Sequence, residues 1–238
     1  MYDWVAKIGM IVPASNTVSE FEFCRMIPKG ISVHISRVLD LGRAVSRSSE
    51  LMEEKMKVAS EILAMANVDI IVYCCTVGSL IKGAGYDLEI VRNIEKWTGL
   101  PALTTSTAVI QAFKKLKFDS VAVGTPYTED MNIRERDFFA SNGFTVKSIK
   151  GLGIINLQEI ANKSPLVAYD LAREVDRPDA SGVFLSCTNL RTIEIIDMLE
   201  ATLKKPVVSS NQASLWAALR KIGVKTPIRR FGKLLLEP

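Results

Sequence analysis

The amino-acid sequence predicts an α/β protein made of two pseudo-symmetric halves, each a parallel sheet flanked by helices, with the active site in the cleft between them. Strand-like and helix-like segments alternate along the chain, a pattern typical of parallel sheets with right-handed crossovers. Two apolar runs each end in a cysteine followed by threonine, and Cys187 comes 112 positions after Cys75 (187 − 75 = 112). A proline turn repeats at nearly the same offset, because Pro126 comes 113 positions after Pro13 (126 − 13 = 113). These repeats indicate a duplicated unit.

The chain of 238 residues is long enough for one large domain or for two of about 115 residues. With 48% hydrophobic and 24% charged residues, it is expected to form a globular protein with a substantial core. We predict a first half at residues 1–117, which carries Cys75, and a second half at residues 118–209, which carries Cys187. The C-terminal segment 210–238 is expected to close the first half.

The charge pattern argues against several classes of partner. The formal net charge of +4 comes from 30 basic and 26 acidic residues that are scattered along the chain. No basic stripe with interleaved aromatic residues appears, so no nucleic-acid partner is expected. No apolar run approaches the roughly 18 residues that a membrane-spanning helix needs, and the run at 8–13 is too short for a signal peptide. We therefore expect a cytoplasmic protein with no membrane partner.

In the first half, residues 5–13 are expected to form a strand, and the polar turn at 14–20 to cap a helix. Apolar residues at helical spacing predict an amphipathic helix from residue 48 to about residue 67. The run Asp69–Tyr73 is rich in β-branched and aromatic residues, as is typical of a strand that is buried on both faces. The other predicted elements are a strand at 31–39, a helix at 86–98, a strand at 101–104 and a helix at 106–116.

The second half repeats this order, with a strand from residue 120, a polar turn after Pro126 and acidic residues that lead into a helix. The further predicted elements are a strand at 145–150, helical segments through residue 177, the strand that leads to Cys187, a helix at 190–204, a strand at 206–209 and a helix at 211–222. The tail at 228–236 is expected to be a last edge strand or part of a subunit contact. Trp216 and the tail's leucines could serve an interface or the core.

The two cysteine turns carry the predicted chemistry. Each lies between a strand and an expected helix start, where backbone N–H groups and the helix dipole stabilise an anion. Such a position favours the thiolate, which is the reactive form of cysteine, and offers donors to a substrate carboxylate or enolate. Cys24 and Cys74 are expected to be structural, because cysteine is often buried and strand alternation turns Cys74 away from Cys75. Disulfides are not expected.

Other types of catalytic site find little support. The only histidine, His34, lies in a strand away from the turns, so a Cys-His pair, a Ser-His-Asp triad and a metal cluster are not expected. No glycine-rich nucleotide motif is present. The remaining polar candidates stand at predicted turns at one sheet edge: Asn16, Thr76, Ser79, Tyr127, Asn156, Thr188 and Asn189.

Several segments together resemble one enzyme family. They are Pro13–Thr17 with Glu20 and Glu22, Cys75–Ser79, Gly124–Tyr127, Ser186–Arg191 and the helix Ser210–Arg220. In this order they are similar to the maleate cis-trans isomerase branch of the aspartate/glutamate racemase superfamily, which also includes arylmalonate decarboxylases. The resemblance covers nearly the whole chain.

This resemblance implies an isomerase that needs no cofactor or metal and converts maleate, or a close cis-dicarboxylate, to fumarate. It implies that Cys75 is the nucleophile and Cys187 the general acid and base. Asn16, Tyr127 and Asn156 match residues that hold the substrate carboxylates. We expect backbone N–H groups of Thr76, Val77 and Thr188 to hold the enediolate that thiolate addition creates. A homo-oligomer, dimer or tetramer, is also expected.

Three alternatives remain open. Amino-acid racemases of the superfamily carry other residues after their cysteines than the Thr-Val after Cys75 and the Thr-Asn after Cys187, although a two-cysteine racemase or epimerase would use the same thiols. Arylmalonate decarboxylases resemble the chain but generally lack a cysteine at the position of Cys75. The third alternative is a protein that binds a dicarboxylate, or senses oxidants with its thiols, without catalysis.

Overall fold

The computed structural model describes residues 5–39 and 49–238 of the chain. The described residues form two four-stranded parallel sheets. The first has the order β2-β1-β3-β4, from β1 (Ala6–Pro13), β2 (Ile31–Val38), β3 (Ile70–Tyr73) and β4 (Ala102–Thr104). The second has the order β6-β5-β7-β8, from β5 (Ser120–Thr125), β6 (Thr145–Gly151), β7 (Gly182–Leu185) and β8 (Val207–Ser209). Both sheets thus have the same topology, and the predicted fold class is confirmed.

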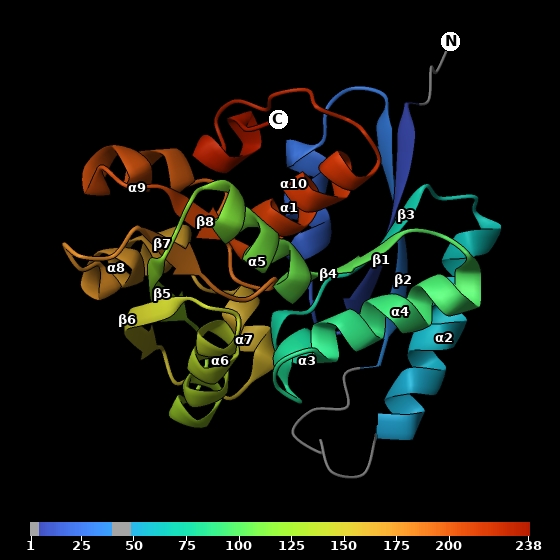
Figure 1. The fold of residues 1–238 in the computed structure, drawn as a ribbon, viewed down its shortest axis with the longest axis horizontal. Helices are drawn as coiled ribbons and strands as arrows, with labels where there is room; N and C mark the ends of the chain where they lie inside the picture. Colours follow the sequence, from blue (N-terminus) through green and yellow to red (C-terminus); the bar gives the residue numbers. More distant parts are fainter. Residues whose placement is uncertain (1–4, 40–48) are drawn as a thin grey trace.

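Helices flank both sheets (Figure 1). Those that follow strands of the first sheet are α1 (Ser19–Met26), α2 (Ser49–Met65), α3 (Thr76–Leu80), α4 (Tyr86–Thr98) and α5 (Thr105–Lys115). Those of the second are α6 (Glu129–Ser141), α7 (Leu157–Ala161), α8 (Pro165–Val175), α9 (Ile196–Leu203) and α10 (Ser210–Lys221), before a final 3-10 helix η1 (Lys233–Leu236). The expected helix start at residue 48 lies outside the described residues. No helix in the described ranges is long and apolar enough to cross a bilayer.

The two halves share one hydrophobic core. Helix α10 follows the second sheet but packs against α5 and α1, which follow strands of the first sheet (Figure 1). The largest buried cluster accordingly contains residues of both sheets, such as Val72 of β3 and Val123 of β5. At its centre the ring of Phe113 contacts the rings of Phe139 and Phe184, with centroids 5.4 and 5.5 Å away. The boundary that we predict at residues 117 and 118 therefore stays a prediction.

Two expectations about the second half are wrong. The helix expected at 190–204 begins only at Ile196, because residues 190–195 form a bend and a turn, in which the N–H groups of Thr192 and Ile193 donate to the Glu22 carboxylate. The tail does not form an edge strand, since residues 233–236 are a 3-10 helix whose Leu234 is buried. Trp216 is also buried, and its indole N–H donates to the carbonyl of Glu237 at 3.1 Å. Leu234, Leu235 and Trp216 therefore pack in the core of this chain, and the subunit contact that was the other expectation for the tail stays a prediction.

Candidate active site

The first cysteine turn joins β3 to α3. Cys75 has an extended backbone (φ −148°) and caps α3, because its Sγ accepts a hydrogen bond from the N–H of Gly78 at 3.2 Å. Its side chain is partly exposed. Cys74 faces the opposite way into the core, and burial raises the pKa of its thiol far above the ordinary range. Cys75 is thus the cysteine of this pair that a small molecule can reach.

The second cysteine turn follows β7. Cys187 has a left-handed backbone with φ 92°, which costs a non-glycine residue about 1–3 kcal/mol and persists only where neighbours hold it. Its N–H donates to Ser210 Oγ at 3.0 Å, and its Sγ accepts from the N–H of Asn189 at 3.4 Å. No helix begins at Thr188, so the expected helix dipole is absent here. The sulfur is instead held by a single backbone N–H and by a tyrosine.

That tyrosine is Tyr127, which follows β5 and is buried. Its hydroxyl forms hydrogen bonds with the Cys187 thiol and with the Ser186 hydroxyl. Burial raises the pKa of Tyr127, so the hydroxyl keeps its proton and can donate it to sulfur. Burial also raises the pKa of Cys187 to about 12, although the Tyr127 hydroxyl and the Asn189 N–H oppose this. Cys187 is therefore a neutral thiol at neutral pH.

Ser210 connects the two cysteine turns. It is fully buried at the start of α10, where its Oγ accepts from the N–H of Cys187 and lies 3.0 Å from Thr76 Oγ1. Thr76 is the residue after Cys75, so the Ser210 hydroxyl links the side chain of Thr76 in the first turn to the backbone of Cys187 in the second. The charges of the two cysteines are also coupled, because Cys75 raises the pKa of Cys187. The structure thus brings Cys75, Thr76, Cys187 and Thr188 to one place.

The first proline turn meets the second cysteine turn. Asn16 is buried, and its Oδ1 accepts from the N–H groups of Val18 and of Ser19, the first residue of α1. Its Nδ2 donates to Thr188 Oγ1 at 2.9 Å, and this hydroxyl in turn donates to the carbonyl of Cys74 at 3.1 Å. Three loops from both sheets therefore interlock around the two thiols.

Asn156 is placed less centrally. It is exposed, and its Oδ1 accepts from the N–H of Gln158 at 3.1 Å, so that it caps α7. The next residue, Leu157, accepts from Asn189 Nδ2 at 3.0 Å, which puts the start of α7 beside the second cysteine turn. Val77 is half-buried on α3. The substrate-binding roles of Asn16, Thr76, Val77, Tyr127, Asn156 and Thr188 stay predictions.

The sequence analysis did not predict that two carboxyls near the site, those of Glu22 and Glu135, are buried. Glu22 of α1 accepts from the N–H of Thr192 at 2.6 Å and from Asn211 Nδ2 at 2.7 Å, and so ties α1 to the loop after Cys187 and to α10. Glu135 of α6 accepts from the hydroxyl of Ser186 at 2.7 Å. Burial raises the pKa of each to about 7. The signal that could have placed Glu135 on an inward face is its helical spacing from Phe138 and Phe139, three and four residues later.

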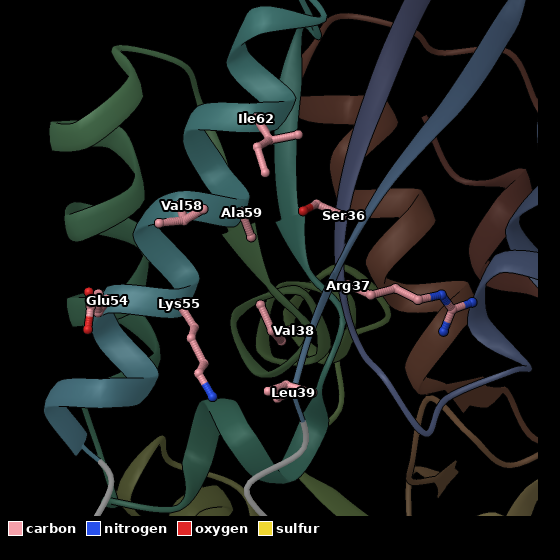
Figure 2. A pocket seen from close by; sticks show the side chains of 9 residues that line it. All are labelled: Ser36, Arg37, Val38, Leu39, Glu54, Lys55, Val58, Ala59 and Ile62. Atoms are coloured by element: carbon pink, nitrogen blue, oxygen red, sulfur yellow. The ribbon is translucent and has the colours of Figure 1, made fainter.

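A separate hollow lies between β2 and α2 (Figure 2). It has a volume of about 320 Å³, and none of its lining residues belongs to a cysteine turn. Arg37 at its rim points away from α2 and donates to the carbonyl of Asn16 at 2.7 Å (Figure 2). This hollow is therefore distinct from the site around the thiols. Within residues 5–39 and 49–238, no group of three His, Cys, Asp or Glu residues is placed to hold a metal.

Comparison with known proteins supports the relationship that the motifs indicated. A model of the arylmalonate decarboxylase family matches residues 8–235. The chain belongs to the arylmalonate decarboxylase family. This confirms the resemblance to the isomerase and decarboxylase branch that we inferred from the sequence.

Three relatives of this family member are informative. The arylmalonate decarboxylase of Bordetella bronchiseptica is 29% identical over 233 residues, which is 97% of this chain and 96% of that protein. A cysteine-to-alanine variant of the maleate isomerase Iso from Pseudomonas putida S16, solved with maleate, has a TM-score of 0.92 at 24% identity and covers 98% of each chain. A cysteine-to-serine variant of the Nocardia farcinica maleate cis-trans isomerase, solved with a covalently bound succinylcysteine intermediate, has a TM-score of 0.89 at 20% identity, over 97% of this chain and 98% of that one. The two isomerase structures show a shared fold.

The arrangement in this arylmalonate decarboxylase family member can perform covalent or acid–base chemistry at carbon. Cys75 is accessible and receives an N–H group, while Cys187 is a neutral thiol with a polar hydroxyl beside it. One group can thus attack while the other donates a proton.

Proposed function

We propose that this enzyme catalyses the cofactor-independent cis–trans isomerisation of maleate, or of a close cis-dicarboxylate, to fumarate. The observation that carries the proposal is the pair of thiols, Cys75 and Cys187, on two turns that Ser210 links. The isomerase structure with a succinylcysteine supports it, because that adduct is what addition of a thiol to maleate produces.

The mechanism must turn a double bond into a single bond for a time, because rotation about a double bond is blocked. In our proposal the Cys75 thiolate adds to C2 of maleate, and the electron pair of the double bond moves into the neighbouring carboxylate as an enediolate. The Cys187 thiol then gives its proton to C3, which leaves a succinyl group on Cys75 and a thiolate on Cys187. After rotation about C2–C3, Cys187 removes a proton from C3, the double bond forms again and Cys75 leaves.

The enediolate needs hydrogen-bond donors. As the first residues of α3, Thr76 and Val77 have N–H groups without an acceptor inside the helix, so these groups are available to an oxyanion. The two thiols also need different starting states. Cys187 fits the role of the acid because burial and the charge of Cys75 raise its pKa, to about 12. The same electrostatic coupling keeps the two sulfurs from being charged together.

The test is a Cys75→Ala variant with maleate, followed by proton NMR of fumarate formation. We expect the rate to fall by at least about 1000-fold, since a lost nucleophile raises the barrier by several kcal/mol. Cys187→Ser should keep part of the rate if the serine can still donate a proton, and mass spectrometry of this variant with maleate should show a succinyl group on Cys75. The matched control is Cys24→Ser, since Cys24 is exposed on α1 and should not matter. Near-normal turnover by Cys75→Ala would refute the assignment.

A second candidate is the decarboxylation of an arylmalonate, which the family model and the 29% identical Bordetella bronchiseptica relative favour. Release of CO2 from phenylmalonate would support this candidate over the isomerase. A racemase or epimerase would incorporate solvent deuterium at a stereocentre in deuterated water. A protein that only binds a dicarboxylate would show protection of its thiols by maleate without any product.

A further inference from the structure

Glu135 is a buried carboxyl that the proposed mechanism does not use. It lies on the inward face of α6 and is fully shielded from solvent. Its Oε1 accepts a hydrogen bond from Ser186 Oγ at 2.7 Å, whereas its Oε2 has no hydrogen-bond partner among the residues that the structure describes. A buried carboxylate with one oxygen left without a donor is costly, so such a residue calls for an explanation.

The hydrogen bonds of Ser186 connect this carboxyl to the acid of the mechanism. Ser186 stands directly before Cys187, and its hydroxyl also bonds to the hydroxyl of Tyr127, which in turn bonds to the Cys187 thiol. The four side chains thus form a chain in the order Glu135, Ser186, Tyr127, Cys187. Each hydroxyl in it has one proton, so each can donate in only one direction at a time.

The protonation of Glu135 therefore decides the direction of the whole chain. When Glu135 is ionised, Ser186 must donate to the carboxylate, so its oxygen can accept from Tyr127 and compete with sulfur for the Tyr127 proton. When Glu135 is neutral, its own proton can go to Ser186, Ser186 can donate to Tyr127, and Tyr127 donates to Cys187. The first arrangement favours a Cys187 thiol and the second stabilises a Cys187 thiolate.

We infer that Glu135 is a positioning residue that acts through Ser186 and Tyr127 to set whether Cys187 is held as a thiol or supported as a thiolate. The negative charge of ionised Glu135 also favours the Cys187 thiol directly, because it raises the pKa of both Cys187 and Tyr127. The consequence for catalysis rests on the proposed function, in which Cys187 gives a proton to carbon and takes one back.

Among the described residues, none supplies a cation that pairs with the Glu135 carboxyl. Burial is the largest influence on its pKa, which is raised to about 7, and only the Ser186 hydroxyl opposes it. Its chain neighbours Arg134 and Arg136 are exposed, and the packed helix α3 contains no charged residue. On β6, which also packs against α6, the two lysines pair elsewhere: Lys147 with Asp179 and Lys150 with Glu174. In the hydrogen-bonded series, the titratable groups besides Glu135 are therefore Tyr127 and Cys187. Cys75 lies outside the series and acts on the pKa of Cys187 through its charge.

The test measures the reactivity of Cys187 directly and needs no turnover. In a Cys75→Ser background, so that only one sulfur of the site reacts, the rate of modification of Cys187 by methyl methanethiosulfonate is followed by peptide mass spectrometry from pH 6 to pH 9. The rate reports the thiolate fraction. We expect its logarithm to rise with pH, to flatten near pH 7 as Glu135 ionises, and to rise again above it.

Glu135→Gln should remove the flattening and increase the rate at pH 8 by about tenfold, because the amide can donate to Ser186 as the neutral acid does and carries no charge. The matched control is Glu22→Gln, which removes the other buried carboxyl but leaves this hydrogen-bond chain intact, and it should keep the flattening. Circular dichroism confirms that each variant is folded.

The outcomes separate this inference from the proposed function. A profile of unit slope through pH 7 with Glu135 present would overturn the inference even if the enzyme isomerises maleate, and this result does not depend on the Glu135→Gln variant being folded. An unchanged rate at pH 8 in folded Glu135→Gln would overturn it as well. A flattening that depends on Glu135 would support it even if maleate is not turned over.

Discussion

Replacing Ser210 by alanine tests whether the link between the two cysteine turns holds the site together. The Ser210 hydroxyl accepts from the N–H of Cys187 and lies 3.0 Å from Thr76 Oγ1, and the residue is fully buried. Ser210→Ala keeps the helix position but removes the one oxygen that both turns share.

The structure gives the expected size of the effect. Loss of the hydroxyl pair costs about 1 kcal/mol, and the buried N–H of Cys187, left without an acceptor, costs about 1–3 kcal/mol more. The free energy of unfolding should thus fall by about 2–4 kcal/mol. Cys187 also has a strained φ of 92°, so its turn should relax once the anchor is gone. A reacting group that moves by about 1 Å typically costs about 100-fold in rate, and we expect kcat to fall by about 10- to 100-fold.

Urea denaturation and steady-state kinetics with maleate measure the two quantities. The matched control is Ser214→Ala, one turn along α10, because Ser214 is equally buried and its hydroxyl bonds to the carbonyl of Ser210 at 2.8 Å and to Thr105 Oγ1 at 3.1 Å, neither of which is a cysteine-turn group. This control should lose about 1 kcal/mol of stability and keep its kcat. If Ser210→Ala also kept the wild-type kcat, the reasoning that Ser210 positions Cys187 would be refuted.

Three further predictions follow from single contacts. Gly78→Ala should lower kcat by tenfold or more, as steady-state assays can show, because a Cβ there would lie 2.9 Å from Cys75 Sγ and 2.3 Å from Tyr73 Oη; an unchanged kcat would mean that the thiol is not held in its observed place. Glu22 binds protons more tightly in the folded protein, with a pKa of about 7 against 4.5, so its contribution to the free energy of unfolding should decline by about 3 kcal/mol as pH rises from 4.5 through 7. Glu22→Gln should make the decline seen in denaturation curves smaller by about 3 kcal/mol and leave the part that Glu135 contributes, whereas a decline of the same size as in the wild type would contradict the assignment. Phe113→Ala should cost about 4 kcal/mol in urea denaturation with little change in kcat, since Phe113 lies in the shared core away from the thiols; a loss below about 1 kcal/mol would argue against its central packing.

Much of the fold could be predicted because it depends on residues that are close together in the sequence. Both sheets consist of short apolar runs that end at turn residues, and the observed strands agree with the predicted ones to within a few residues. The repeated spacing of the proline and cysteine turns predicted two similar units, and the two sheets have the same strand order. Cys75 and Cys187 stood out because each ends a buried strand, and the carboxyl ends of parallel strands meet at one sheet edge.

The errors arose where distant residues decide the local structure. The segment 190–195 was expected to be helical, but it forms a bend and a turn whose Thr192 and Ile193 N–H groups donate to Glu22, which lies about 170 residues earlier in the sequence. The tail at 228–236 was expected as an edge strand or a subunit contact, yet its residues 233–236 form a 3-10 helix that buries Leu234 against α10. Local propensity is worth tenths of a kcal/mol per residue, whereas a buried charge or leucine is worth several times more.

The sequence by itself determined the fold class, the family resemblance and the two thiols, because strand periodicity and turn chemistry are written in neighbouring residues. Only the tertiary structure decided how those thiols are held: by Ser210 from a third element, by Tyr127 on the sulfur of Cys187, and by the buried carboxyl of Glu135 behind Ser186. Such contacts depend on side chains from separate strands and helices that meet only after the shared core has packed. The spacing of residues along the chain therefore does not predict them.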